Sequence, residues 1–166
     1  MTSNKQTYVI DEKTLNLIDQ IKKKFPVREN KSAIIESLLL LQDNNNGYIT
    51  KEIMNALANY LNVEEIDVYE VATFYSMLNT KPVGRNVIAV CTNVSCMLRG
   101  SKKILNHIEK KLQTKVGGST KDNKFFLKDE IECLAACSEA PMMQVNHKNI
   151  ENLTIEKVDK ILEELS

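Results

Sequence analysis

The chain has 166 residues, 27% of them charged, and its formal net charge is zero. That length accommodates one domain, or a small domain with a helical extension, around a real hydrophobic core. A balanced charge creates no overall field that would draw the chain to nucleic acid or to an anionic membrane, and the lack of tryptophan argues against base-stacking surfaces, so we expect no nucleic-acid partner.

The N-terminus reads MTSNKQTYVI and lacks the apolar core of a signal peptide. No stretch approaches the roughly 18 apolar residues of a membrane-spanning helix. We therefore expect no direct membrane insertion and a reducing compartment, where disulfides are rare. The lack of an Arg-rich, acid-poor leader favours the bacterial cytoplasm, although a processed mitochondrial matrix chain would look the same.

The first 80 residues have the periodicity of short helices. Residues 1–10 are polar and predict a flexible tail. One helix is predicted from residue 11 until Pro26 ends it, and a second, apolar almost all round, from about residue 30 to the asparagine and glycine run at 44–47. We interpret residues 11–80 as a helical bundle that docks a partner.

Two further helices are predicted in this bundle. Thr50 is a candidate N-cap for the third helix, and Asn62 with Glu65 has the spacing of a capping box for the fourth. The fourth helix carries aromatic side chains that at helical spacing are typical of core or interface packing rather than of a cofactor site: Tyr69, Phe74 and Tyr75.

The periodicity changes after the turn at residues 80–84, which we take as the domain boundary. Residues 84–166 predict strand, helix, strands and helix in that order. The predicted elements are a strand at 86–90, a helix with Ile104, Leu105, Ile108 and Leu112 on one face, a strand from 125 that leads through Ile131 to Cys133, a strand at 142–145 and a last helix from Thr154.

All four cysteines lie in two tight pairs, Cys91 with Cys96 and Cys133 with Cys137. Two disulfides are disfavoured by the reducing compartment, and a thiol-disulfide oxidoreductase would prefer the C-x-x-C spacing. A structural zinc site usually has pairs separated by two to four residues, whereas iron-sulfur clusters use longer and uneven gaps. The spacing therefore favours a 2Fe-2S cluster and leaves a structural zinc module as the alternative.

The neighbouring residues narrow this choice. Residues 68–100 read VYEVATFYSMLNTKPVGRNVIAVCTNVSCMLRG, and residues 132–146 read ECLAACSEAPMMQVN. Over about residues 8–165 the chain resembles the small thioredoxin-like ferredoxin subunit of respiratory complex I, the NADH:quinone oxidoreductase. The resemblance implies an α/β chain: an N-terminal helical bundle followed by a thioredoxin-like domain that carries one 2Fe-2S cluster.

The resemblance also implies which residues bind the cluster and what the chain does. Cys91 and Cys96 would bind one iron, and Cys133 and Cys137 the other. The chain would exchange single electrons with the FMN of a large partner subunit, which alone binds FMN and NADH, and would not be a catalyst in isolation. Further partners would be other peripheral-arm iron-sulfur subunits, at the inner face of the bacterial plasma membrane. The equivalent subunit of an NAD-linked hydrogenase or formate dehydrogenase is the alternative.

Several residues near the cysteines have expected roles. Backbone N–H groups of the two cysteine loops, with the Ser95 and Ser138 hydroxyls, are candidate tuners of the reduction potential, and Arg99 is a candidate source of positive charge. The family usually has glycine where Ala135 stands. If that position requires a positive φ, alanine strains the loop by about 1–2 kcal/mol. The Asn146–Asn149 segment also departs from the family's acidic turn.

Four other residues have side chains of types that can bind a metal ion or contact a partner. His107 and His147 are expected at the surface rather than as ligands. Met142 and Met143 are a candidate partner contact, with packing in the core as the favoured alternative.

Overall fold

The computed structural model describes residues 8–129 and 133–165. The chain divides into two compact units, Met1–Pro82 and Val83–Ser166, which are described separately below. In the described ranges no helix has both the length and the apolar character needed to cross a membrane.

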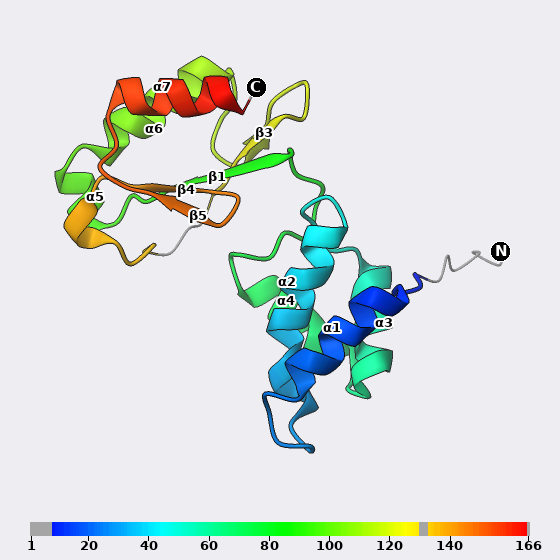
Figure 1. Cartoon of the computed structure of the whole chain (residues 1–166). Helices are drawn as coiled ribbons and strands as arrows, with labels where there is room; N and C mark the ends of the chain where they lie inside the picture. The colour runs from blue at the N-terminus through cyan, green and yellow to red at the C-terminus, as the bar shows by residue number, and fades with distance from the viewer. Residues whose placement is uncertain (1–7, 130–132, 166) are drawn as a thin grey trace. The chain divides into compact units, whose positions relative to one another are not determined.

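The described part of the first unit, residues 8–82, contains helices and no strands (Figure 1). Its elements are α1 (Glu12–Lys22), the 3-10 helix η1 (Asn30–Ala33), α2 (Ile34–Asn44), α3 (Lys51–Leu61) and α4 (Glu65–Phe74). The four predicted helices are thus present, and the expected stop after the second one is made by Asn46 and Gly47, both with positive φ.

Polar side chains mark where these helices begin. The Asp11 carboxylate accepts a hydrogen bond from the Thr14 N–H at 3.0 Å, and the Thr50 hydroxyl, as predicted, accepts one from the Ile53 N–H at 3.3 Å. The predicted capping box of Asn62 and Glu65 is wrong. Asn62 takes a left-handed φ of 53° and ends α3, because asparagine tolerates this conformation, and α4 follows Glu64 instead.

The buried Gln42 side chain joins two segments of the helical unit. Apolar side chains from all four α-helices fill the core of this unit, among them Ile18, Leu38, Leu57 and Val68. Gln42 is buried beside them; its Nε2 donates to the Met77 carbonyl at 3.1 Å, and its Oε1 accepts from the Asn79 N–H at 2.6 Å. The segment after α4 is thereby fastened to α2.

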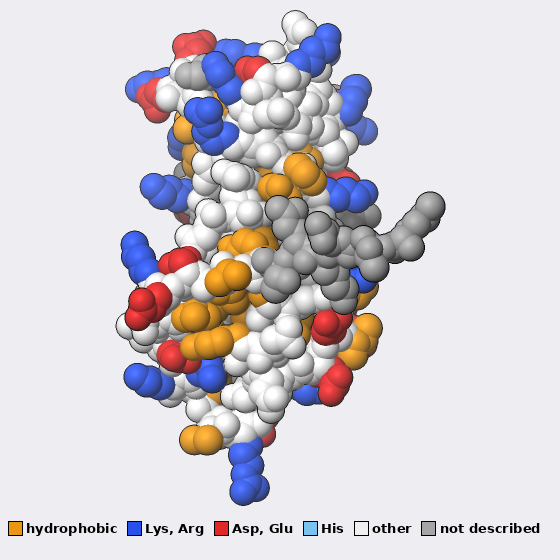
Figure 2. Space-filling view, turned by 90° about the vertical axis from the view of Figure 1, so that its right-hand side faces the viewer, with side chains coloured by type: hydrophobic (Ala, Val, Ile, Leu, Met, Phe, Trp, Pro, Cys, Tyr) orange, Lys and Arg blue, Asp and Glu red, His pale blue; other side chains and the backbone are white. Residues whose placement is uncertain are grey.

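Helix α4 is apolar on two faces. Val68 and Ala72 are buried in the core, whereas Ile66, Tyr69 and Phe74 are exposed, Phe74 by 79%. These aromatic side chains therefore do not fill the core of the unit. Figure 2 shows hydrophobic side chains at the surface of the helical unit among scattered charged ones.

The second unit combines a five-stranded sheet with helices. Its elements are β1 (Asn86–Val90), α5 (Val94–Leu98), α6 (Ser101–Leu112), β2 (Gly118–Ser119), β3 (Phe125–Leu127), the 3-10 helix η2 (Cys137–Glu139), β4 (Met143–Val145), β5 (Lys148–Ile150) and α7 (Ile155–Glu164). The strand order is β2-β3-β1-β4-β5. β1 runs parallel to β3 and antiparallel to β4, and β2 and β5 are antiparallel edge strands.

The hydrophobic core of this unit lies on one face of the sheet. Alternate residues of the three central strands point to the same side, as Ile88 and Val90 do in β1. They pack against α6 through Ile108 and against α7 through Val158, and the two helices lie side by side over that face (Figure 1). The predicted α/β class is confirmed, and β1 delivers Cys91 at its C-terminal end.

Gly84 lies where the chain enters this sheet. A Cβ atom at this position would stand 2.4 Å from the backbone carbonyl carbon of Phe125 in β3 and 2.5 Å from its oxygen. Only glycine permits this approach of two backbones, which explains the glycine in the PVGR turn.

Candidate metal centre

The first pair of cysteines leaves the sheet and enters α5. Cys91 directly follows β1, and its N–H donates to the Met142 carbonyl at 3.1 Å, which extends the pairing of β1 beyond the sheet. Cys96 lies within the short helix α5. Both side chains are only 2% exposed. The strand end and the helix therefore hold two thiols inside the unit.

The second pair lies in a short irregular loop. Cys133 and Cys137 are exposed, and their Sγ atoms are 3.8 Å apart. Two thiolates bound at about 2.3 Å to one tetrahedral metal ion stand about 3.8 Å apart. The pair thus has the separation of two ligands of one metal ion. The residue at Ala135 has a φ of +58°, the conformation that glycine adopts most readily.

The two loops meet at Cys91. The backbone N–H of Leu134 and that of Asn93 donate to the Cys91 thiol, which also contacts the thiols of Cys96 and Cys133. Burial raises the pKa of Cys91, but these hydrogen bonds outweigh burial, and its pKa is lowered overall. Of the two buried thiols, Cys91 is thus the one whose pKa is lowered.

Two of the other thiols are shifted in the opposite direction. Burial, together with the neighbouring Cys91, raises the pKa of Cys96 against the effect of a hydrogen bond from the Met142 N–H. For Cys133 the Ala135 N–H lowers the pKa, but the hydrogen bond with the Cys137 thiol, some loss of hydration and the charges of Cys137 and Cys91 together raise it more. Thiolates at such close range repel one another, so a full set of four requires a positive counter-charge such as a metal ion.

A small apolar cluster encloses the buried pair. Ala140 and Met142 are buried against Cys91 and Cys96, and Leu134 and Ala136 pack on them. Met142 and Met143 are 1% and 0% exposed, so they are core residues and the interpretation of this pair as a partner contact is wrong. Apolar surroundings limit the access of water to the sulfur atoms.

The two histidines lie away from the cysteines. His107 Nε2 is 2.7 Å from the Asp159 carboxylate, between α6 and α7, and His147 is an exposed turn residue with a φ of 65°. Within residues 8–129 and 133–165, no three histidine, cysteine, aspartate or glutamate side chains meet the spacing of a single-ion site. All four cysteines are free, so the disulfide alternative is not realised.

Arg99 lies beside the second cysteine loop, which agrees with its expected role as a source of positive charge near the cysteines. Its Nη1 donates to the carbonyl oxygen of Ser138 at 3.0 Å and to that of Ala140 at 3.2 Å. The guanidinium therefore contacts the backbone of the second cysteine loop from the end of α5.

The donors to the thiols are backbone groups that residue identity does not reveal. The Leu134 and Met142 N–H groups donate across loops, to Cys91 and Cys96. Only the general expectation that cysteine loops supply N–H groups points to them. Ile131, which is predicted to lead the second strand to Cys133, lies outside the described residues.

Comparison of this chain with known proteins identifies related families and folds. The model of the thioredoxin-like 2Fe-2S ferredoxin family matches residues 18–166. Among solved structures, an NAD+-reducing NiFe hydrogenase in the air-oxidized state matches with a TM-score of 0.68 at 17% identity, over 85% of this chain. This chain spans about 24% of that hydrogenase chain, so the likeness concerns the fold alone.

Curated relatives are similar over nearly the whole length. A subunit of the NADH-quinone oxidoreductase of Rickettsia felis is 45% identical over 96% of this chain and 95% of its own. The mitochondrial NADH dehydrogenase (ubiquinone) flavoprotein 2 of Dictyostelium discoideum is 38% identical over 93% of this chain and 62% of its own. The family model matches most of the chain and the relatives are similar over most of its length, so the chain belongs to the thioredoxin-like 2Fe-2S ferredoxin family.

Proposed function

We propose that this chain is an electron-transfer subunit of an NADH-quinone oxidoreductase and holds one 2Fe-2S cluster through Cys91, Cys96, Cys133 and Cys137. The observation that carries the proposal is the packing of Leu134 and Ala136, from the second cysteine loop, against buried Cys91 and Cys96. The Sγ atoms of Cys133 and Cys137 in that loop are 3.8 Å apart. Membership of the family and the names of the relatives support the same function.

The donor set suits a pair of bridged irons. Each loop supplies two thiols, and the Cys133–Cys137 separation of 3.8 Å suits one tetrahedral iron. When bound, the cluster supplies one-electron redox chemistry. The chain's own part is to hold the four thiolates, to surround the buried pair with apolar side chains and to direct backbone N–H groups at the sulfur atoms, which stabilises their negative charge.

The electron donor in this proposal is the FMN of a large subunit that also binds NADH. The chain has no glycine-rich phosphate loop of its own, so hydride transfer belongs to the partner. The isolated chain then carries electrons without turning over NADH. Through the other peripheral-arm iron-sulfur subunits, it would lie at the cytoplasmic face of the membrane in a bacterium.

The helical unit is proposed to dock this partner. Ile66, Tyr69 and Phe74 expose apolar surface on α4, and buried aromatic side chains contribute strongly to interfaces between proteins. A subunit of an NAD-linked hydrogenase is the second candidate, since the fold is shared with an NAD+-reducing hydrogenase.

Electron transfer from the flavin is tested by co-expressing the chain with the flavin- and NADH-binding subunit. We expect the two to copurify and NADH to produce an EPR signal of the reduced 2Fe-2S cluster under anaerobic conditions. The Cys91→Ser variant should lose that signal. A complex that contains FMN and an oxidised cluster that NADH does not reduce would contradict the proposal. Replacing NADH by hydrogen, with a hydrogenase partner, tests the second candidate.

A further inference from the structure

Arg99 joins the two cysteine loops. It follows α5, which carries Cys96, and its backbone N–H donates to the Ser95 carbonyl at 3.2 Å. Its Nη1 reaches the second loop, where the carbonyls of Ser138 and Ala140 accept hydrogen bonds at 3.0 and 3.2 Å. One side chain thus connects the helix of the first pair with the residues that follow Cys137.

We propose that Arg99 is a positioning residue, which holds the Cys137 segment against α5 so that the thiols remain at cluster-binding distance. The inference rests on the proposed function in that the group bound between the loops is a 2Fe-2S cluster. Arg99 does not touch a sulfur atom in this proposal; it acts through the backbone carbonyls of Ser138 and Ala140.

The second cysteine loop has little regular secondary structure of its own, so its position depends on contacts such as that of Arg99. Glu139 and Ala140 donate N–H bonds back to Ala136 and Cys137 at 3.2 and 3.4 Å, which is a single turn of 3-10 helix. The Asn152 N–H donates to the Glu139 carbonyl at 2.7 Å, but this joins the loop to the segment before α7 and not to α5. Short 3-10 turns are weak, so the position of Cys137 depends on tertiary contacts.

Besides the apolar packing of Ala136 and Ala140 against Cys91 and Cys96, hydrogen bonds join the loops at two places along the second loop. Leu134, just after Cys133, donates to the Cys91 thiol, and Arg99 binds the carbonyls just after Cys137. Cys137 lies between these two contacts. Loss of the Arg99 contact leaves the first end of the loop in place. At the other end only the bonds of Asn152 to Glu139 and the packing of Ala140 remain, and we therefore expect the ligand Cys137 to be the one affected.

Arginine suits this task for two reasons. Its guanidinium stays charged at all relevant pH values and carries two N–H donors on the same nitrogen, enough for both carbonyls. A hydrogen bond from a charged donor is roughly twice as strong as one between neutral groups. The positive charge also lies near a set of thiolates, so the position of the loop and the stability of the bound anionic group are both favoured.

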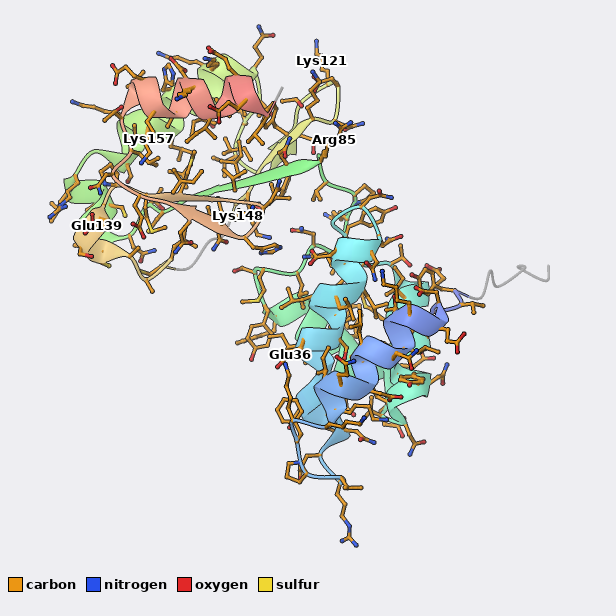
Figure 3. The ribbon with its side chains drawn as sticks, in the orientation of Figure 1. Glu36, Arg85, Lys121, Glu139, Lys148 and Lys157 are labelled. Atoms are coloured by element: carbon orange, nitrogen blue, oxygen red, sulfur yellow. The ribbon has the colours of Figure 1, made fainter. Side chains whose placement is uncertain are left out.

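The test compares Arg99→Met with Arg99→Lys in the full chain reconstituted with iron and sulfide. Methionine removes the charge and the donors, whereas lysine retains both on a shorter side chain. Release of iron to an excess of a coloured ferrous chelator, after reduction with dithionite, gives the rate of cluster loss. Arg85→Met is the matched control, because Arg85 is exposed and lies at the opposite end of the unit from Glu139 of the second loop (Figure 3).

Removal of a group behind the metal ligands typically lowers metal affinity about 10- to 100-fold. We expect this loss to appear in the release rate, so that Arg99→Met loses iron about 10- to 100-fold faster than the wild type. Arg99→Lys should lose iron at a rate between those of the wild type and Arg99→Met, and Arg85→Met should lose iron at the wild-type rate. An Arg99→Met rate within about twofold of the Arg85→Met rate overturns the proposal.

Amide hydrogen exchange of the metal-free chain separates a local from a global effect. In Arg99→Met, faster exchange confined to the residues around Cys137 supports the proposal, and faster exchange spread equally over β1, β3 and β4 overturns it. This measurement needs no cluster. If the wild-type chain binds no iron, the proposed function fails, while the exchange data still show whether Arg99 holds the loop.

Discussion

Asn146 Nδ2 donates a hydrogen bond of 2.9 Å to Asn86 Oδ1, and so the turn between β4 and β5 is fastened to the start of β1. The Asn146 Oδ1 also accepts from the Val87 N–H at 2.8 Å. Asn146 has a φ of 47°, which asparagine tolerates better than most residues. In the segment at 146–149, expected only to depart from the family's turn, residues 146 and 147 thus form a hairpin turn that fixes the end of β1 farthest from Cys91, and residues 148 and 149 begin β5.

Asn146→Asp should destabilise the α/β unit by about 1–3 kcal/mol. The carboxylate keeps the acceptor for the Val87 N–H but sets an oxygen against Asn86 Oδ1, where no proton is available. Hydrogen exchange of the β1 and β4 amides measures the change. Asn149→Asp is the control: Asn149 Oδ1 accepts from Gln144 Nε2 at 3.0 Å, and a carboxylate does the same, so it should be nearly neutral.

Ala135→Gly should stabilise the second cysteine loop by roughly 0.5–1 kcal/mol, because the relief of about 1–2 kcal/mol of left-handed strain exceeds the entropic cost of glycine. The strain follows from the φ of +58° at Ala135. Exchange of the Leu134 amide, which donates to the Cys91 thiol, reports on the loop.

Ala136→Gly is the matched control for this prediction. Ala136 has a φ of −118°, outside the left-handed region, so glycine there relieves no left-handed strain and should destabilise the loop by about 0.4–1 kcal/mol. Equal effects of the two glycine substitutions would show that the backbone at Ala135 is not strained.

Gly84→Ala should destabilise the α/β unit by about 1–3 kcal/mol, since the added methyl group would press on the Phe125 carbonyl of β3 and force the strands apart. Urea unfolding of the metal-free chain, followed through the β1 and β3 amides, measures the loss. Arg85→Ala at the next, exposed position should change stability by less than about 0.5 kcal/mol. Comparable losses for both variants would disprove the close-approach explanation.

The contacts of Asp159 with His107 and Lys111 predict that the stability of the fold depends on pH. Hydrogen bonds from His107 and then from Lys111 lower the pKa of the Asp159 carboxyl below its ordinary value of 3.8, and Glu156 and Glu163 are the other charged groups that face this cluster. A carboxyl with a lowered pKa stabilises the fold above its unfolded-state pKa, and this stabilisation is lost as pH falls through the folded-state pKa.

The wild type should therefore unfold at a higher temperature than Asp159→Asn at pH 6. This difference in unfolding temperature should begin to fall near the pKa of the carboxyl in the unfolded chain and disappear below its pKa in the folded chain. Thermal unfolding at a series of pH values measures it. Glu164→Gln removes a carboxylate from the same helix but not from this cluster, and its difference from the wild type should change less with pH. A difference that persists unchanged at pH 2 would contradict the linkage.

Much of this structure follows from local sequence features. The helical periodicity located the four helices of the first unit, because each has an apolar face that must be buried. The apolar run at 86–90 located β1, and the spacing of the cysteines located the candidate metal centre. The departure from glycine at Ala135 indicated where the backbone has a positive φ.

Other features depend on the tertiary structure and leave little mark on the sequence. β2 and β5 have only two and three residues, too few for an alternating pattern to be recognised. Asn62 has the identity of an N-cap but ends a helix, because asparagine serves both positions. The contact of Arg99 with two carbonyls joins residues about forty positions apart, and backbone acceptors have no residue identity to read.

The central claim is that two cysteine loops hold one pair of bridged irons. The most direct measurement is iron, acid-labile sulfide and zinc content of the anaerobically purified full chain, together with EPR after one-electron reduction. We predict about two irons and about two sulfides per chain, and a reduced-state EPR signal that disappears in Cys137→Ser. One zinc ion per chain, or a colourless protein without iron, would contradict the account.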